Sequence, residues 1–166
     1  MMMGYNTLFK LAAFFILVVN FACSPGAKYD STIPLYIGTY TSEGSEGIYM
    51  ARFDTINGAL IQPVLAAQLH NPSYLALTPC KSYLFAVSEG DGSVANLFSY
   101  RVEAGSGLLT LADSVATGGA GSSYVSLVGC GRLAIANYSS GDVSFISFNE
   151  DGVFPDAGTE HWRNIA

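Results

Sequence analysis

A repeat with a period of about 50 residues constrains this chain more than any other feature of its sequence. Cys80 recurs as Cys130 after 50 residues, and three strand-like segments that end at Tyr40, Glu89 and Tyr138 follow one another at intervals of 49 residues. Self-similarity at a fixed period marks a repeat architecture, in which neighbouring units bury a shared core. The sequence therefore predicts a series of similar units rather than one irregular domain.

Each unit holds four short segments of alternating or apolar residues separated by turns. In the best-preserved copy these segments are Tyr74–Thr78, Tyr83–Glu89, Asn96–Val102 and Leu108–Val115. Abundant Tyr, Phe and Gly, with few Lys, also favour strands and tight turns. Four strands in about 50 residues are typical of a β-propeller blade. The predicted fold class is all-β, with blades of four antiparallel strands; the alternative is a β-sandwich whose internal similarity is accidental.

The count of strands predicts about two and a half blades. Blade 1 is expected over residues 35–67 with three strands, blade 2 over residues 72–116 with four, and blade 3 over residues 122–154 with about three. Residues 23–34 are interpreted as a linker. Residues 155–166 match nothing in the repeat and are interpreted as a tail outside the blades.

Residues 1–22 have a different character from the rest of the chain. Leu11–Val19 is an unbroken apolar run, too short to span a bilayer but suited to a signal peptide. Cys23 follows Ala and precedes Ser, which resembles the lipidated first residue of a mature bacterial lipoprotein, although Asn20 stands where that motif usually has an aliphatic residue. We expect a signal peptide over residues 1–22, a lipid on Cys23 and a location in the bacterial cell envelope, lipid-anchored or periplasmic. An ordinary cleaved signal and a retained apolar anchor are the alternatives.

Charge and motifs exclude several classes of function. The net charge is −6 and Lys and Arg never cluster, so nucleic acid is not an expected partner. Contact with a membrane is expected only through a lipid anchor at Cys23. The sequence has no P-loop, no G-x-S-x-G elbow, no H-E-x-x-H motif and no EF-hand loop. We therefore expect no metal and no cofactor.

The two repeated cysteines are expected to be free. Cys80 and Cys130 both fall in the turn between the first and second strands of their blades. Equivalent turns on neighbouring blades are usually too far apart for the short span of a disulfide. An exported protein could still pair them, which remains the alternative.

Three segments together resemble a known family. These are "YIGTYTSEGSEGIYMARFD", "NPSYLALTPCKSYLFAVSE" and "GGAGSSYVSLVGCGRLAIANYSSGDVSFISFNEDG". They are similar to the opening of the seven-bladed lactonase propellers, the family of the propeller-type 6-phosphogluconolactonase and the muconate-lactonizing enzyme. The resemblance covers about Leu35 to Gly152, and Ala136-Asn137-Tyr138 with the following Gly141 is fairly specific in combination with the other segments.

The resemblance implies a hydrolase whose partner is a small sugar lactone. Seven blades of about 50 residues need roughly 350 residues, so the chain is expected to be an incomplete, inactive N-terminal part of such an enzyme. The principal catalytic residues are then expected in later blades. The alternative is a non-catalytic envelope lipoprotein whose propeller binds a glycan or a protein.

Polar residues at equivalent strand ends form the expected site. The turns after these strands share one face of a propeller with the segments that link blades, so Tyr40, Glu89 and Tyr138 are expected at one pocket mouth, with His70 nearby. Glu89 and His70 are the candidate catalytic residues, as a base or a holder of water. Tyr40, Asn137 and Tyr138 are the candidate substrate-binding residues. Each also has a plain structural interpretation, such as an Asn that caps a turn or a Tyr that packs between blades.

Overall fold

The computed structural model describes residues 31–90, 94–155 and 159–163. The predicted signal segment and Cys23 lie outside these residues. Among the residues that are described, no helix is long and apolar enough to cross a membrane.

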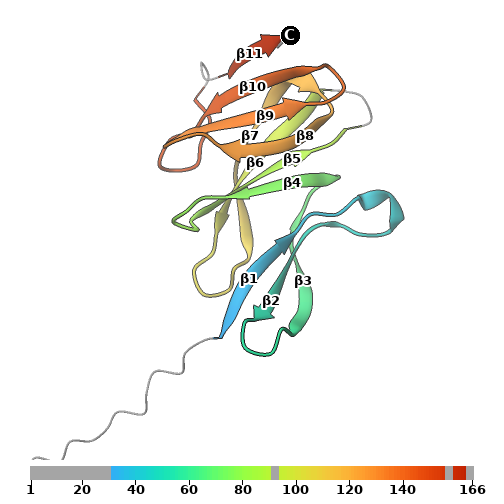
Figure 1. The fold of residues 1–166 in the computed structure, drawn as a ribbon, viewed down its shortest axis with the longest axis vertical. Coiled ribbons are helices and arrows are strands. Elements are labelled where there is room, and N and C mark those ends of the chain that lie inside the picture. Colours follow the sequence, from blue (N-terminus) through green and yellow to red (C-terminus); the bar gives the residue numbers. More distant parts are fainter. Residues whose placement is uncertain (1–30, 91–93, 156–158, 164–166) are drawn as a thin grey trace, which may run out of the picture.

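The chain forms three antiparallel sheets that follow one another along the molecule (Figure 1). Their strands are β1 (Thr32–Ile37), β2 (Gly47–Asp54), β3 (Leu60–Gln68), β4 (Pro72–Leu77), β5 (Tyr83–Ser88), β6 (Val94–Val102), β7 (Leu109–Ala120), β8 (Ser122–Leu127), β9 (Arg132–Asn137), β10 (Asp142–Ser147) and β11 (Thr159–Arg163).

Each sheet is a simple meander in which every strand pairs with the next one in sequence. The orders are β1-β2-β3, β4-β5-β6-β7 and β8-β9-β10-β11. This is the blade pattern that the repeat predicts, and the predicted all-β fold class is confirmed. We call these sheets blades 1, 2 and 3.

Residues 155–166 were predicted to be a tail outside the blades, but residues 159–163 within them form strand β11. It pairs antiparallel with β10, placing Glu160 opposite Phe145, and gives blade 3 a fourth strand. Arg132 forms a 2.7 Å salt bridge with Glu160, and Trp162 packs edge-on against Phe145. The sequence of this short strand shows little apolar alternation, so its pairing becomes evident only when the neighbouring strands are in place.

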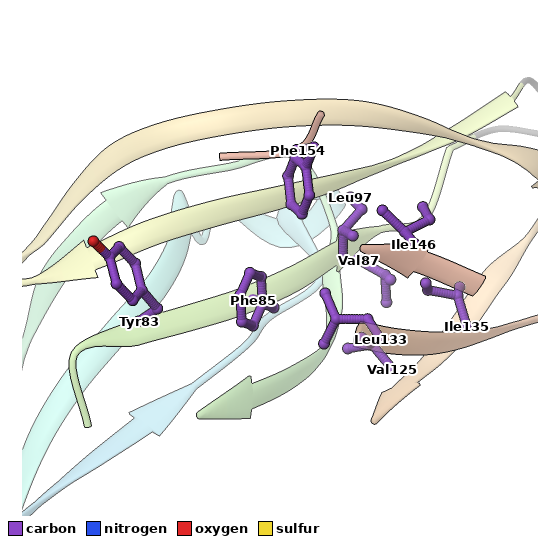
Figure 2. Packing of buried hydrophobic residues seen from close by; sticks show 9 residues of the cluster. All are labelled: Tyr83, Phe85, Val87, Leu97, Val125, Leu133, Ile135, Ile146 and Phe154. Atoms are coloured by element: carbon purple, nitrogen blue, oxygen red, sulfur yellow. The ribbon is translucent and has the colours of Figure 1, made fainter. Parts of the chain in front are cut away.

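Strand β5 is buried on both faces and holds two cores together. Its even-numbered residues Leu84 and Ala86 pack with Ile48 and Leu69 of the blade 1 side. Its odd-numbered residues pack toward blade 3, where the side chains from both sheets converge (Figure 2). This second cluster consists of Tyr83, Phe85, Val87, Leu97, Val125, Leu133, Ile135, Ile146 and Phe154. Because successive side chains of β5 point to opposite faces, this strand packs against both blade 1 and blade 3.

Both repeated cysteines are free and exposed, as expected. They lie in the turns between the first and second strands of blades 2 and 3. The Thr78 hydroxyl, 3.3 Å from Cys80 Sγ, lowers the pKa of Cys80, and hydrogen bonds from the Ser82 side chain and backbone add to this effect. Together they bring the pKa of Cys80 to about 7.

Alkylation of Cys80 by iodoacetamide is expected to reach half of its maximal rate near pH 7. The thiolate is the reacting form, so a lowered pKa makes the reaction fast at neutral pH and slow only below it. Thr78→Val should move the profile to higher pH. The measurement is the rate of carbamidomethylation by mass spectrometry in Cys23→Ser,Cys130→Ser protein. An unchanged profile in Thr78→Val would contradict the stated cause.

Candidate functional site

The strand ends of blades 2 and 3 meet the linking segments in the same way. The Glu89 amide donates to the Asn71 carbonyl at 2.9 Å, and 49 residues later the Tyr138 amide donates to the Gly121 carbonyl at 2.9 Å. Asn71 and Gly121 both have positive φ, of 39° and 66°. Asn and Gly are the residues that tolerate this conformation best. The predicted sharing of one face by strand ends and linking segments is therefore seen in two blades.

Tyr40 and Glu89 are joined across blades 1 and 2. The Tyr40 hydroxyl donates a 2.8 Å hydrogen bond to Glu89 Oε2. This hydrogen bond, and then the negative charge of Glu89, raises the pKa of Tyr40. The phenol therefore keeps its proton and acts as the donor, although its side chain is 59% exposed. Two residues predicted for the site are thus in direct contact.

The His70 ring belongs to a closed set of hydrogen bonds with Thr41 and Asn71. The Thr41 backbone amide donates to Asn71 Oδ1 at 2.8 Å, which identifies that atom as the amide oxygen. Asn71 Nδ2, 3.1 Å from His70 Nε2, is then the donor to that ring nitrogen. His70 Nδ1 carries the proton toward Thr41 Oγ1 at 3.0 Å, and Thr41 Oγ1 donates to Asn71 Oδ1 at 3.0 Å. The lone pair of the ring is therefore already occupied.

Asn71 is a residue of the candidate site that the sequence analysis missed. Its side chain holds Thr41 and His70, and its carbonyl holds the backbone of Glu89. Ser88 adds a 2.6 Å hydrogen bond from its hydroxyl to the His70 carbonyl. The available signal was the Asn-Pro dipeptide at the start of β4, which is typical of a turn. The linking segment thus positions Glu89 as well as His70.

An open groove of about 660 Å³ lies between blades 1 and 2 on this face. His70 lines it, together with Ser88, which directly precedes Glu89. The Tyr40–Glu89 pair lies beside the groove rather than among its lining residues. The lining consists of Thr41, Ser45, Glu46, Gln68, Leu69, His70, Ser88, Asn96 and Phe98.

Tyr138 and Asn137 occupy opposite environments in blade 3. Tyr138 is 84% exposed and lines a smaller hollow of about 290 Å³. Asn137 is 1% exposed: Nδ2 donates to Asp142 Oδ1 at 2.6 Å and to Ser144 Oγ at 2.7 Å, and Oδ1 accepts from Ser122 Oγ at 2.6 Å. Both donors of its amide are committed to the protein. Asn137 therefore has a structural role in this network, although it also lines the hollow beside Tyr138, and its contact with substrate stays a prediction.

Asn137→Ala is expected to lower the apparent melting temperature by roughly 10 °C. It removes three buried hydrogen bonds and leaves polar groups without that partner, at about 1–3 kcal/mol for each such group. The measurement is a thermal melt by circular dichroism. Asn57→Ala is the matched control, because Asn57 also accepts a hydrogen bond but lies in an exposed turn. Equal melting shifts in the two variants would contradict the structural role.

The fold and the site define three consecutive blades of a β-propeller with a polar site on the face of the linking segments. The family described as "Lactonase, 7-bladed beta-propeller" matches residues 34–162, a range that includes most of β11. The chain belongs to this family.

Several proteins that resemble this chain are named lactonases. The 6-phosphogluconolactonase of Bacillus subtilis is 37% identical over 118 residues, which cover 70% of this chain and 34% of that protein. The periplasmic gluconolactonase of Pseudomonas aeruginosa has a TM-score of 0.68 at 34% identity, covering 75% of this chain and 37% of that one. A Bacteroides uniformis protein has a TM-score of 0.73 at 34% identity, covering 80% and 38%. The chain spans about a third of the length of the curated relatives it matches.

Proposed function

We propose that these three blades supply part of the active site of an envelope-located hydrolase of sugar lactones, with Glu89 as its base. The observation that carries this proposal is the 2.8 Å hydrogen bond from Tyr40 to Glu89 beside the open groove. A carboxylate has about four acceptor positions, so Glu89 can hold a water molecule while Tyr40 orients it. The names of the relatives support a lactone as the substrate.

Hydrolysis of a lactone needs a base for water, a donor for the oxyanion and a proton for the ring oxygen. In the proposed reaction Glu89 takes a proton as the water oxygen bonds to the carbonyl carbon. The tetrahedral intermediate then breaks its bond to the ring oxygen, which receives that proton, and the product is a hydroxy acid. Tyr138 offers its hydroxyl group to the substrate, whereas the Tyr40 hydroxyl, whose proton goes to Glu89, can accept a hydrogen bond from a substrate hydroxyl. His70 has its ring lone pair occupied by Asn71, so we assign it to positioning rather than to proton transfer.

The groove favours an uncharged sugar lactone over a phosphorylated one. Its lining includes Glu46 and, among the described residues, neither Lys nor Arg. Phosphate binding usually relies on such cations or on helix N-termini. The proposal for these blades is therefore a non-phosphorylated lactone, a substrate that is also compatible with an exported enzyme.

Anchoring to the membrane is expected to depend on Cys23. Metabolic labelling with a palmitate analogue should mark the protein in its bacterial host, and Cys23→Ser should lose the label because a lipidated cysteine is the proposed attachment point. Cys130→Ser is the control and should keep the label. Equal labelling of the Cys23→Ser and unsubstituted proteins would remove the anchor from the proposal.

A chimera tests the lactonase proposal directly. Residues 34–162 of this chain replace the aligned segment of the Bacillus subtilis 6-phosphogluconolactonase, so that the remaining blades are present. The assay is acid release from glucono-1,5-lactone and from its 6-phosphate, corrected for spontaneous opening. The proposal expects turnover of the lactone and a shift in preference toward the non-phosphorylated substrate relative to the parent enzyme. A chimera with the size and melting behaviour of the parent but no turnover would contradict the proposal, and ligand binding without turnover would favour the binding-protein alternative.

A further inference from the structure

Two exposed tyrosines stand in contact on the first strands of blades 2 and 3. Tyr74 of β4 and Tyr124 of β8 occupy equivalent positions, 50 residues apart. Their ring centroids are 4.5 Å apart with an angle of 49° between the planes. They are 39% and 45% exposed, respectively, although they lie on adjacent strands. In a propeller the first strands of the blades surround the central channel.

The same backbone irregularity precedes both tyrosines. The pairing of β4 with β5 shifts register between Pro72 and Tyr74, and the pairing of β8 with β9 shifts between Ser122 and Tyr124. Such bulges redirect side chains and occur often beside active sites. Ser73, within the first bulge, also donates to the Ser122 carbonyl at 3.4 Å. The orientation of the two rings is therefore attributed to the local backbone geometry, since neither ring belongs to a buried cluster.

Along the strands, the tyrosine pair lies two residues away from the strand ends that carry the proposed site residues. Tyr74 is opposite Val87, two residues before Glu89, and Tyr124 is opposite Ala136, two residues before Tyr138. Two residues of a strand span about 7 Å. At this backbone spacing, a sugar ring held on the tyrosines can lie near Glu89.

We propose that Tyr74 and Tyr124 form a subsite that binds the ring of the sugar lactone through its apolar C–H face. This inference rests on the proposed lactonase function and names the part of the protein that selects a ring substrate. Aromatic faces suit such a surface, and phenol hydroxyls at its border can bond the substrate hydroxyls. Partial desolvation, followed by the neighbouring Tyr124 phenol, raises the pKa of Tyr74, so its hydroxyl stays a donor.

The test measures binding separately from turnover. The probe is D-glucono-1,5-lactam, a ring analogue that water does not open, applied to the full 166-residue chain in mild detergent and to the chimera. Saturation of the aromatic protons is expected to transfer mainly to the C–H protons of the lactam. Tyr124→Leu and Tyr74→Leu should each weaken lactam affinity about three- to tenfold, whereas Tyr124→Phe should keep it. Trp162→Leu, which removes an exposed ring from the outer strand β11, is the control and should have no effect.

The outcomes separate this inference from the proposed function. Absence of saturation transfer in both proteins, or equal lactam affinity in folded Tyr→Leu variants and unsubstituted protein, overturns the subsite even if the chimera hydrolyses lactones. Weakened binding in the Leu variants together with an inactive chimera keeps the subsite and rejects the hydrolase. If a Leu variant does not fold, the saturation transfer in unsubstituted protein decides alone.

Discussion

Glu89→Gln in the chimera is expected to lower kcat/KM for glucono-1,5-lactone by about 10²- to 10⁴-fold, the usual contribution of a general base. Gln keeps the shape of the side chain and can still accept a hydrogen bond from Tyr40, but it cannot take a proton from water. Tyr40→Phe removes only the orienting donor and should cost about tenfold. Both rates are measured by continuous titration of the acid released.

The control for this prediction is Glu103, a carboxylate elsewhere in the chain that also accepts a hydrogen bond from a hydroxyl group. Glu103 accepts a 2.8 Å hydrogen bond from the Thr110 hydroxyl, as Glu89 does from Tyr40, but it follows β6 at the other end of blade 2. Glu103→Gln should leave the rate within about twofold of the parent chimera. Equal losses in the two variants, or full activity in Glu89→Gln, would remove Glu89 from the proposed mechanism.

A polypeptide of residues 24–166 alone is expected to self-associate and to hydrolyse no lactone. Ile33 pairs with Phe53, which pairs with Leu60, so these side chains share one face of blade 1. Blade 2 covers the other face, where Met50 and Tyr36 lie. Ile33 and Leu60 are 49% and 52% exposed. Repeat units bury both faces against neighbours, and exposed apolar faces with open strand edges promote association.

Gel filtration with light scattering measures this association. Leu35→Lys puts a charge on the exposed face of blade 1 and should reduce the apparent mass. Ile56→Lys, in the exposed turn between β2 and β3, is the matched control and should leave the mass unchanged. A monomer with lactone hydrolysis above background would contradict both parts of the expectation, and the chimera is expected to be monomeric because the remaining blades cover this face.

The arrangement of the blades was predictable from the sequence because it depends on local patterns. Strand alternation and turn residues located β4, β5 and β6 to within two residues. The period of 49 to 50 residues aligned Tyr40 with Glu89 closely enough to predict that both lie at one pocket mouth, and the structure places them in contact. The same alignment placed Cys80 and Cys130 in separate turns, and therefore predicted free thiols. These features follow from backbone geometry that each repeat specifies by itself.

Only the tertiary structure decided which way the site side chains face and what they bond. Asn137 and Tyr138 are neighbours in sequence, yet one is buried in a polar network and the other is exposed, because successive residues at a strand end point in opposite directions. The proton position on His70 depends on Asn71 and Thr41, which come from two different segments. Strand β11 depends on the edge that β10 offers, and the aim of Tyr74 and Tyr124 depends on two bulges. Each of these features arises from contacts between segments, which a pattern within one segment does not contain.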